Sequence, residues 1–131
     1  MTTQDLAGKI LQWATKEFGN IATLPDERAL RLLEEAVEAA QAMGVNKEQC
    51  LAVVARCYGK SPGDPVKELG QVGICLLAAC AVMHCDAQAV WEKEARRLFS
   101  LPQGYFTDRY AAKVAAGIAR GATPTTTTKE Q

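Results

Sequence analysis

The sequence has too little of several residue types to support many common kinds of site. It holds one histidine, His84, among 131 residues, so a histidine-based metal or catalytic site has little to build on. Fifteen Lys and Arg balance fifteen Asp and Glu. Proteins that wrap nucleic acid need an excess of basic charge to neutralise phosphates. We therefore expect no nucleic-acid partner, although a small anionic ligand stays compatible with a local cluster of charge.

The sequence also lacks the cysteine patterns of disulfide frameworks and zinc sites, and it shows no signal peptide for export. The five cysteines are odd in number and include no C-x-x-C pair, so neither a disulfide framework nor a zinc site is predicted. Most lie in apolar helical patterns, where we expect small core residues and free thiols suited to a reducing cytoplasm. No basic segment followed by an apolar one marks a signal peptide, and the apolar run of residues 69–83 is short for a bilayer. We therefore expect a cytoplasmic protein without a membrane partner.

The pattern that is present is helical along almost the whole chain, and no segment shows strand alternation. Five helices are predicted, at about residues 5–18, 25–44, 47–57, 65–84 and 87–99, with a further helical segment at about 106–119. Asn46 and Gln49 form a capping-box pattern, and Asp64 with Pro65 marks another helix start. We expect one all-α domain, a four- to five-helix bundle over residues 1–120, and a disordered polar tail at 121–131.

The fourth predicted helix indicates how that bundle is completed. Between Leu69 and Met83 it carries no charged residue, and Gln71 is its one clearly polar residue. A helix that is apolar all round must be covered on all sides, which a few short helices can barely achieve. We therefore expect a homo-oligomer, a dimer or a tetramer, in which helices of different chains pack together.

The second predicted helix carries a cluster of carboxylates. At 100° per residue, Leu30, Leu33 and Val37 fall on one side of the wheel, and the acids fall on the other together with Arg31: Glu27, Glu34, Glu35 and Glu38. Such a cluster can be an ordinary solvated acidic face. However, like charges at this spacing repel, and hard oxygen ligands are what Mg²⁺ or Mn²⁺ requires. Arg28 and Arg31 are expected to balance the glutamates.

A fourth carboxylate, Glu68, lies in the first turn of the apolar helix. It can be a cap-region acid that favours the helix dipole. It can equally be a fourth metal ligand, brought opposite the glutamate helix by antiparallel packing.

These residues together resemble a known signature. Leu33-Glu34-Glu35-Ala36-Val37-Glu38, followed by Lys67-Glu68-Leu69-Gly70-Gln71, resembles the E-x-x-E … E-x-x-D pattern of MazG-like all-α NTP pyrophosphohydrolases. The similarity runs from about residue 13 to residue 97. Further segments look like a phage branch of that family: Trp13 … Phe18-Gly19, Glu27-Arg28-x-x-Arg31 and Tyr58-Gly59-Lys60 … Gly63-Asp64-Pro65.

The resemblance implies an activity and a site. Enzymes of this family bind a (d)NTP with two or three Mg²⁺ or Mn²⁺ ions and release a nucleoside monophosphate and pyrophosphate. Carried onto this chain, Glu35, Glu38 and Glu68 would be metal ligands, and Glu34 would be a further ligand or would orient the attacking water. The MazZ enzymes of the phage branch prefer guanine nucleotides, which makes dGTP the expected substrate. The last acid of the signature is Gln71 here, which puts the full metal count in doubt.

Other residues have candidate roles in holding the nucleotide. Lys60 and Arg97 are candidates for the outer phosphates, against the alternative of ordinary surface charges. Trp13 and Phe18 could stack on the base, although core packing is the commoner role of such aromatics. The glycine- and proline-rich loop of residues 59–65 lacks the Walker pattern and is interpreted as a connector.

Two other functions remain open from the sequence. The chain could be a non-catalytic helical protein that binds nucleotides or partners, its chemistry lost with the acid at position 71. It could also be a house-cleaning or dUTPase-like pyrophosphatase of another base specificity. Convergence of Glu35, Glu38 and Glu68 would favour an enzyme.

Overall fold

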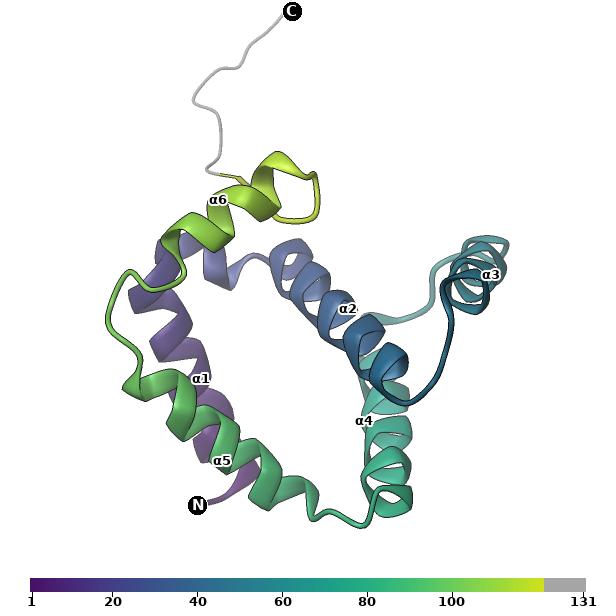
Figure 1. The fold of residues 1–131 in the computed structure, drawn as a ribbon, viewed down its shortest axis with the longest axis horizontal. Coiled ribbons are helices and arrows are strands. Elements are labelled where there is room, and N and C mark those ends of the chain that lie inside the picture. The colour runs from purple at the N-terminus through teal and green to yellow at the C-terminus, as the bar shows by residue number, and fades with distance from the viewer. Residues whose placement is uncertain (122–131) are drawn as a thin grey trace, which may run out of the picture. The chain divides into compact units, whose positions relative to one another are not determined.

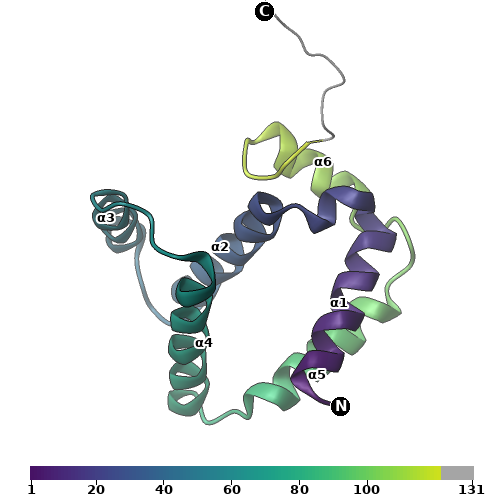
Figure 2. The same ribbon diagram turned by 180° about the vertical axis from the view of Figure 1, so that it is seen from behind.

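The computed structural model describes residues 1–121, and this part of the chain is all-helical, as predicted. It contains one 3₁₀ helix and six α-helices: α1 (Thr3–Phe18), η1 (Gly19–Thr23), α2 (Pro25–Ala42), α3 (Lys47–Tyr58), α4 (Pro65–Val82), α5 (Ala87–Ser100) and α6 (Thr107–Ala115) (Figures 1 and 2). The additional segment expected at 106–119 is α6, a shorter helix. Residues 122–131, nearly all of the predicted tail, lie outside the described residues.

Helices α3, α4 and α5 begin at side chains that satisfy the first backbone N–H groups. Asn46 accepts a bond from the N–H of Gln49 at 2.9 Å, and the Gln49 carboxamide accepts one from the N–H of Asn46, so the predicted capping box is confirmed. The Asp64 carboxylate likewise accepts from the N–H of Lys67 at 2.9 Å. Asp86 accepts from the N–H of Ala89 and starts α5. The predicted starts of these three helices are therefore correct to within a residue.

Helices α2 and α4 end in the same left-handed turn, which also ends α6 at Gly117. Gly44 follows α2 with φ of 102°, and the N–H of Val45 donates to Ala40 O. His84 follows α4 with φ of 57°, and the N–H of Cys85 donates to Cys80 O. Glycine adopts this conformation without strain, whereas histidine has a Cβ that opposes it. The end of α4 therefore carries a local strain that the end of α2 does not.

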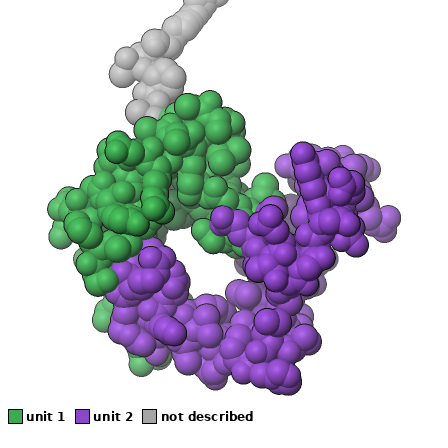
Figure 3. All heavy atoms as spheres, in the orientation of Figure 1, with its two compact units in different colours: residues 1–36, 99–131 green, residues 37–98 purple. Residues whose placement is uncertain are grey.

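The helices belong to two compact units (Figure 3). Unit 1 comprises residues 1–36 and the chain from Phe99 onward, and unit 2 comprises residues 37–98. The buried residues of unit 1 are Leu6, Ala14, Ala22 and Glu27. Around them lies an aromatic cluster in which Trp13 packs against Phe18, Phe99 and Phe106 with ring centroids 5.9–6.2 Å apart. Unit 1 thus has a small core that draws on both ends of the chain.

Unit 2 has almost no core within the single chain. Ala95 is its one buried residue. Large apolar side chains of α3 and α4 are exposed instead, including Val53 at 60%, Leu69 at 58% and Ile74 at 66%. The expectation of core cysteines is wrong for this chain by itself, because Cys57 and Cys75 are exposed and the other three are half-buried. The physical reason for the two exposed cysteines is that no described residue of unit 2 covers the faces of α3 and α4 on which they lie.

Candidate functional site

The carboxylate cluster lies on one uninterrupted helix. Glu34, Glu35 and Glu38 are all within α2, so their spacing of three and four residues places them one helical turn apart. Glu35 and Glu38 are exposed, and Glu34 is half-buried. The local part of the predicted site, three acids projecting close together from one helix, follows directly from this geometry.

Glu34 differs from its neighbours because two cations reach it. Its Oε1 accepts a bond from Arg31 NH1 at 2.9 Å and one from Lys113 Nζ at 2.8 Å. Arg31 balances the glutamates, as expected, but Lys113 comes from α6 and no pattern in the sequence pointed to it. Both cations bind the same oxygen of Glu34, Oε1. Glu34 is therefore held in place and partly neutralised.

Glu27 is not on the solvent-facing side on which its place on the helical wheel put it. It is completely buried, and its Oε1 accepts the backbone N–H of Arg120 at 2.8 Å. Its Oε2 lies 3.2 Å from Arg31 Nε and 3.5 Å from Arg28 NH2. The correction has a clear cause: the segment after α6 lies over the first turn of α2, and a helical wheel cannot show a segment that returns from the far end of the chain.

Several polar contacts fasten that returning segment. Arg120 pairs through its guanidinium with Asp26 at 2.7 Å, Arg31 donates to Ile118 O, and the Tyr110 hydroxyl donates to Arg120 O. Burial raises the pKa of Tyr110 above its ordinary value, and the nearby negative charge of Glu27 adds to this shift. The part of α2 that holds Glu34 is therefore clamped by the C-terminal segment of unit 1.

Glu68 lies at the start of α4, where its side chain folds against the preceding loop. A Cβ placed on Gly63 would lie 2.5 Å from Glu68 Oε1, so the glycine leaves room for this carboxylate. Within residues 1–121 no three His, Cys, Asp or Glu side chains form a group that could hold a metal ion. Glu34 and Glu35 belong to unit 1, whereas Glu38 and Glu68 belong to unit 2. Convergence of the four acids stays a prediction.

The two predicted phosphate-binding residues have different surroundings. Arg97 donates from Nε to Glu94 Oε1 at 2.8 Å, and this hydrogen bond lowers the pKa of Glu94. Lys60 is exposed in the loop between α3 and α4. Arg97 would therefore have to leave a carboxylate before it could bind a phosphate.

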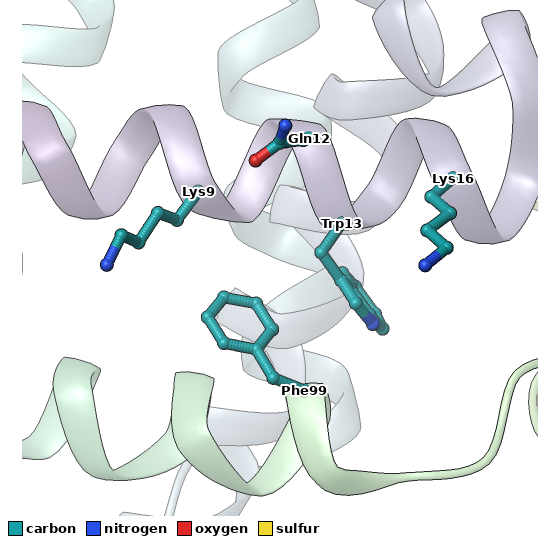
Figure 4. A pocket seen from close by; sticks show the side chains of 5 residues that line it. All are labelled: Lys9, Gln12, Trp13, Lys16 and Phe99. Carbon is teal, nitrogen blue, oxygen red and sulfur yellow. The ribbon is translucent and has the colours of Figure 1, made fainter.

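The two predicted base-binding aromatics pack against each other, and each makes a further contact. Phe18 packs on Tyr110 with ring centroids 5.2 Å apart. Trp13 instead lines a cavity of about 410 Å³ with Phe99 and three polar side chains of α1: Lys9, Gln12 and Lys16 (Figure 4). The polar members were missed in the sequence, although Gln12 and Lys16 follow Lys9 by three and seven residues, which places them on one face of a helix together with Trp13.

A comparison with protein-family models, curated proteins and solved structures found no match to this chain. Among the described helices, α4 is long and apolar enough to cross a membrane by length and composition, and none of it is buried. The core helix of a soluble protein can have the same composition, but it would ordinarily be covered.

Proposed function

We propose that this chain is a metal-dependent (d)NTP pyrophosphohydrolase of the MazG-like kind, with dGTP as its substrate. The observation that carries the proposal is the set of three glutamates on one face of α2, one of them fixed by cations from two helices. The donor set suits the metal, because carboxylate oxygens are the ligands that Mg²⁺ and Mn²⁺ prefer. A chain with a single histidine also fits chemistry that requires no histidine or serine nucleophile.

The proposed roles follow from the side chains and their surroundings. Glu35, Glu38 and Glu68 would hold two or three ions, which neutralise the phosphates and make bound water a better nucleophile. Glu34, oriented by Arg31 and Lys113, would accept the proton of the attacking water through Oε2. The amide of Gln71 would contribute an oxygen without charge, so the site would hold one ion fewer than a full set of acids allows.

We further propose that the chain works in the cytoplasm as a homo-oligomer, a dimer or a tetramer with a shared helical bundle. Unit 2 spans 62 residues, from 37 to 98, yet buries one alanine. Burying a large aliphatic side chain stabilises a fold by about 1.5–3 kcal/mol. The exposed apolar residues of α3 and α4 do not contribute most of this stabilisation in the single chain. The zero net charge of the chain would not oppose association of identical copies.

A non-catalytic function is the second candidate, and Gln71 is the observation in its favour. A neutral residue where the signature has an acid weakens metal binding, so a protein of this kind could hold a nucleotide without cleaving it. A pyrophosphatase of another base specificity would share all the residues above.

A substrate panel tests the activity. The protein is incubated with each dNTP and NTP, with Mg²⁺, with Mn²⁺ and with chelator, and the products are separated by ion exchange. Metal-dependent release of monophosphate and pyrophosphate, fastest with dGTP, is expected. Glu38→Ala should abolish this release while its helical spectrum stays unchanged. Glu48→Ala, a substitution of an exposed glutamate on α3, should keep the activity of the wild-type chain. Full activity in Glu38→Ala would eliminate the proposed site, and no turnover by folded protein would favour the binding function.

Light scattering after gel filtration tests the assembly. The wild-type chain is expected to elute as a dimer or a tetramer, and Ile74→Glu on α4 should dissociate or unfold it. Ser61→Glu, which adds the same charge in the exposed loop, is the matched control and should leave the mass unchanged. A stable wild-type monomer, or flotation of the protein with lipid vesicles, would contradict the proposal.

A further inference from the structure

The cavity lined by Trp13 and Phe99 combines an aromatic surface with two basic side chains. It is bounded by two aromatic rings in contact, with centroids 6.2 Å apart, and it is flanked by the ammonium groups of Lys9 and Lys16 (Figure 4). The lysines are seven residues apart on α1, so they lie about 10 Å from each other along the helix axis with the tryptophan between them. The cavity therefore offers apolar ring faces with a positive charge on each side.

One lysine of the cavity has an acid within electrostatic range, because the charge of Lys9 acts on Asp5, four residues away on the same helix. Neither lysine forms an ion pair with any residue of the described part of the chain. The acids closest in sequence are engaged by backbone groups: Asp5 accepts the N–H of Thr2 at 3.1 Å, and Glu17 accepts the N–H of Gly104 at 2.7 Å. No acid lines the cavity itself. Its electrostatic character is thus opposite to that of the glutamate face of α2.

From these features we infer that the cavity is a metal-independent binding site for a nucleoside monophosphate. A planar base can pack on the indole and phenyl rings, and the Gln12 carboxamide can both donate to and accept from the edge of the base. A phosphate monoester carries a charge of about −1.5 to −2 at pH 7, which two ammonium groups match. A triphosphate without metal carries a larger charge than the lysines can balance.

The size of the cavity agrees with this class of ligand. Its volume of about 410 Å³ lies toward the lower end of the range of roughly 300–1,000 Å³ found for small-molecule sites. A single base with one sugar phosphate suits such a space better than a polynucleotide, which the neutral chain also disfavours. Because the site shares no residue with the glutamate cluster, it does not depend on the proposed hydrolysis.

Fluorescence provides a direct test because the chain has two tryptophans, Trp13 and Trp91. Trp91→Phe leaves Trp13 as the only reporter. This variant is titrated with dGMP at low salt in the presence of chelator, and calorimetry on the wild-type chain repeats the measurement without any substitution. Saturable binding of dGMP is expected. Deoxyguanosine, which lacks the phosphate, and inorganic phosphate, which lacks the base, should each bind at least about tenfold more weakly.

Single substitutions then locate the ligand. Lys9→Ala and Lys16→Ala should each weaken dGMP binding about tenfold, as for loss of a charge-assisted contact. Lys47→Ala, an exposed lysine outside the cavity, should leave binding within about twofold of the parent. Equal binding of phosphate and dGMP, equal effects of all three lysine variants, or no binding by either method would overturn the inference.

A last comparison separates this site from the proposed active site. Glu38→Ala should bind dGMP in chelator as tightly as the parent chain, even though it is expected to lose hydrolysis. Loss of dGMP binding in Glu38→Ala would assign the ligand to the glutamate face and overturn the inference. Absence of hydrolysis in the wild-type chain, with dGMP binding intact, would instead reject only the proposed function.

Discussion

Replacing Glu27 should unfasten the C-terminal segment from α2. The side chain is completely buried, and it receives a backbone N–H of Arg120 on one oxygen and the guanidinium groups of Arg28 and Arg31 near the other. Glu27→Ala removes the anion and leaves the largely covered Arg31 with Glu34 as its remaining partner. Breaking a buried ion pair from one side costs about 3–5 kcal/mol, and because Arg31 keeps one partner we expect a cost of about 3 kcal/mol. Single domains have a total stability of about 5–15 kcal/mol, so the loss should be easy to detect.

A conservative substitution separates charge from hydrogen bonding. Glu27→Gln keeps an oxygen that can accept from the N–H of Arg120, so only the charged interactions are lost. We expect a cost of about 1–3 kcal/mol, between that of the alanine variant and zero. Glu94→Ala is the matched control, because Glu94 forms an exposed pair with Arg97 and such pairs contribute about 0–1 kcal/mol.

Urea denaturation followed by circular dichroism gives the free energy of unfolding, and hydrogen exchange of the α6 amides locates the change. In Glu27→Ala the α6 amides should exchange much faster, even under conditions in which the rest of the helices stay folded. Unchanged stability and unchanged α6 exchange in both Glu27 variants would refute the proposed clamp. An equal loss in the glutamine and alanine variants would show that the charge, not the bond to Arg120, carries the effect.

Three further predictions concern other places in the fold. His84→Gly should raise the free energy of unfolding by about 1 kcal/mol, seen as a higher urea midpoint, because glycine relieves the left-handed strain at φ of 57°; an unchanged midpoint would remove the strain argument. The raised pKa of Tyr110 means that its contribution to stability is complete below pH 10 and is lost as the pH rises through the folded-state pKa. Absorbance titration should show one tyrosine ionising above the usual range, and Tyr110→Phe should remove it. Gly63→Ala should displace the Glu68 carboxylate and weaken Mn²⁺ binding in calorimetry with little change in the helical spectrum; unaltered Mn²⁺ affinity would argue against Glu68 as a ligand.

The features of the fold that could be predicted from the sequence are those set by nearby residues. The cap residues Asn46 and Asp64 accept hydrogen bonds from backbone groups three residues later. Both partners therefore lie in the same short stretch of sequence, where they can be recognised. The capping box of α1 was missed, and the helix starts at Thr3 instead of about residue 5, because Thr2 and Asp5 precede its apolar pattern. The spacing of the three glutamates on α2 was predictable for the same local reason.

The features that could not be predicted depend on segments far apart in the chain. Lys113 reaches Glu34 across 79 positions, and Arg120 covers Glu27 across 93. No periodicity within α2 can encode these partners, so Glu27 was placed in solvent and the cation on Glu34 was overlooked. The cavity at Trp13 was not predicted, because Phe99, which lines it, comes from a distant segment of the chain; base stacking by Trp13 stays a prediction.

The discontinuous make-up of unit 1 has a consequence for synthesis of the protein. Residues 1–36 are translated before unit 2, but the groups that bury Glu27 and complete the aromatic cluster are translated after it. The N-terminal helices therefore have to wait, incompletely packed, while the whole of unit 2 is translated. A chain that stops before α6 would lack the N–H of Arg120 that Glu27 accepts and the ring of Tyr110 that packs on Phe18, so its N-terminal helices would expose surface that the longer chain covers.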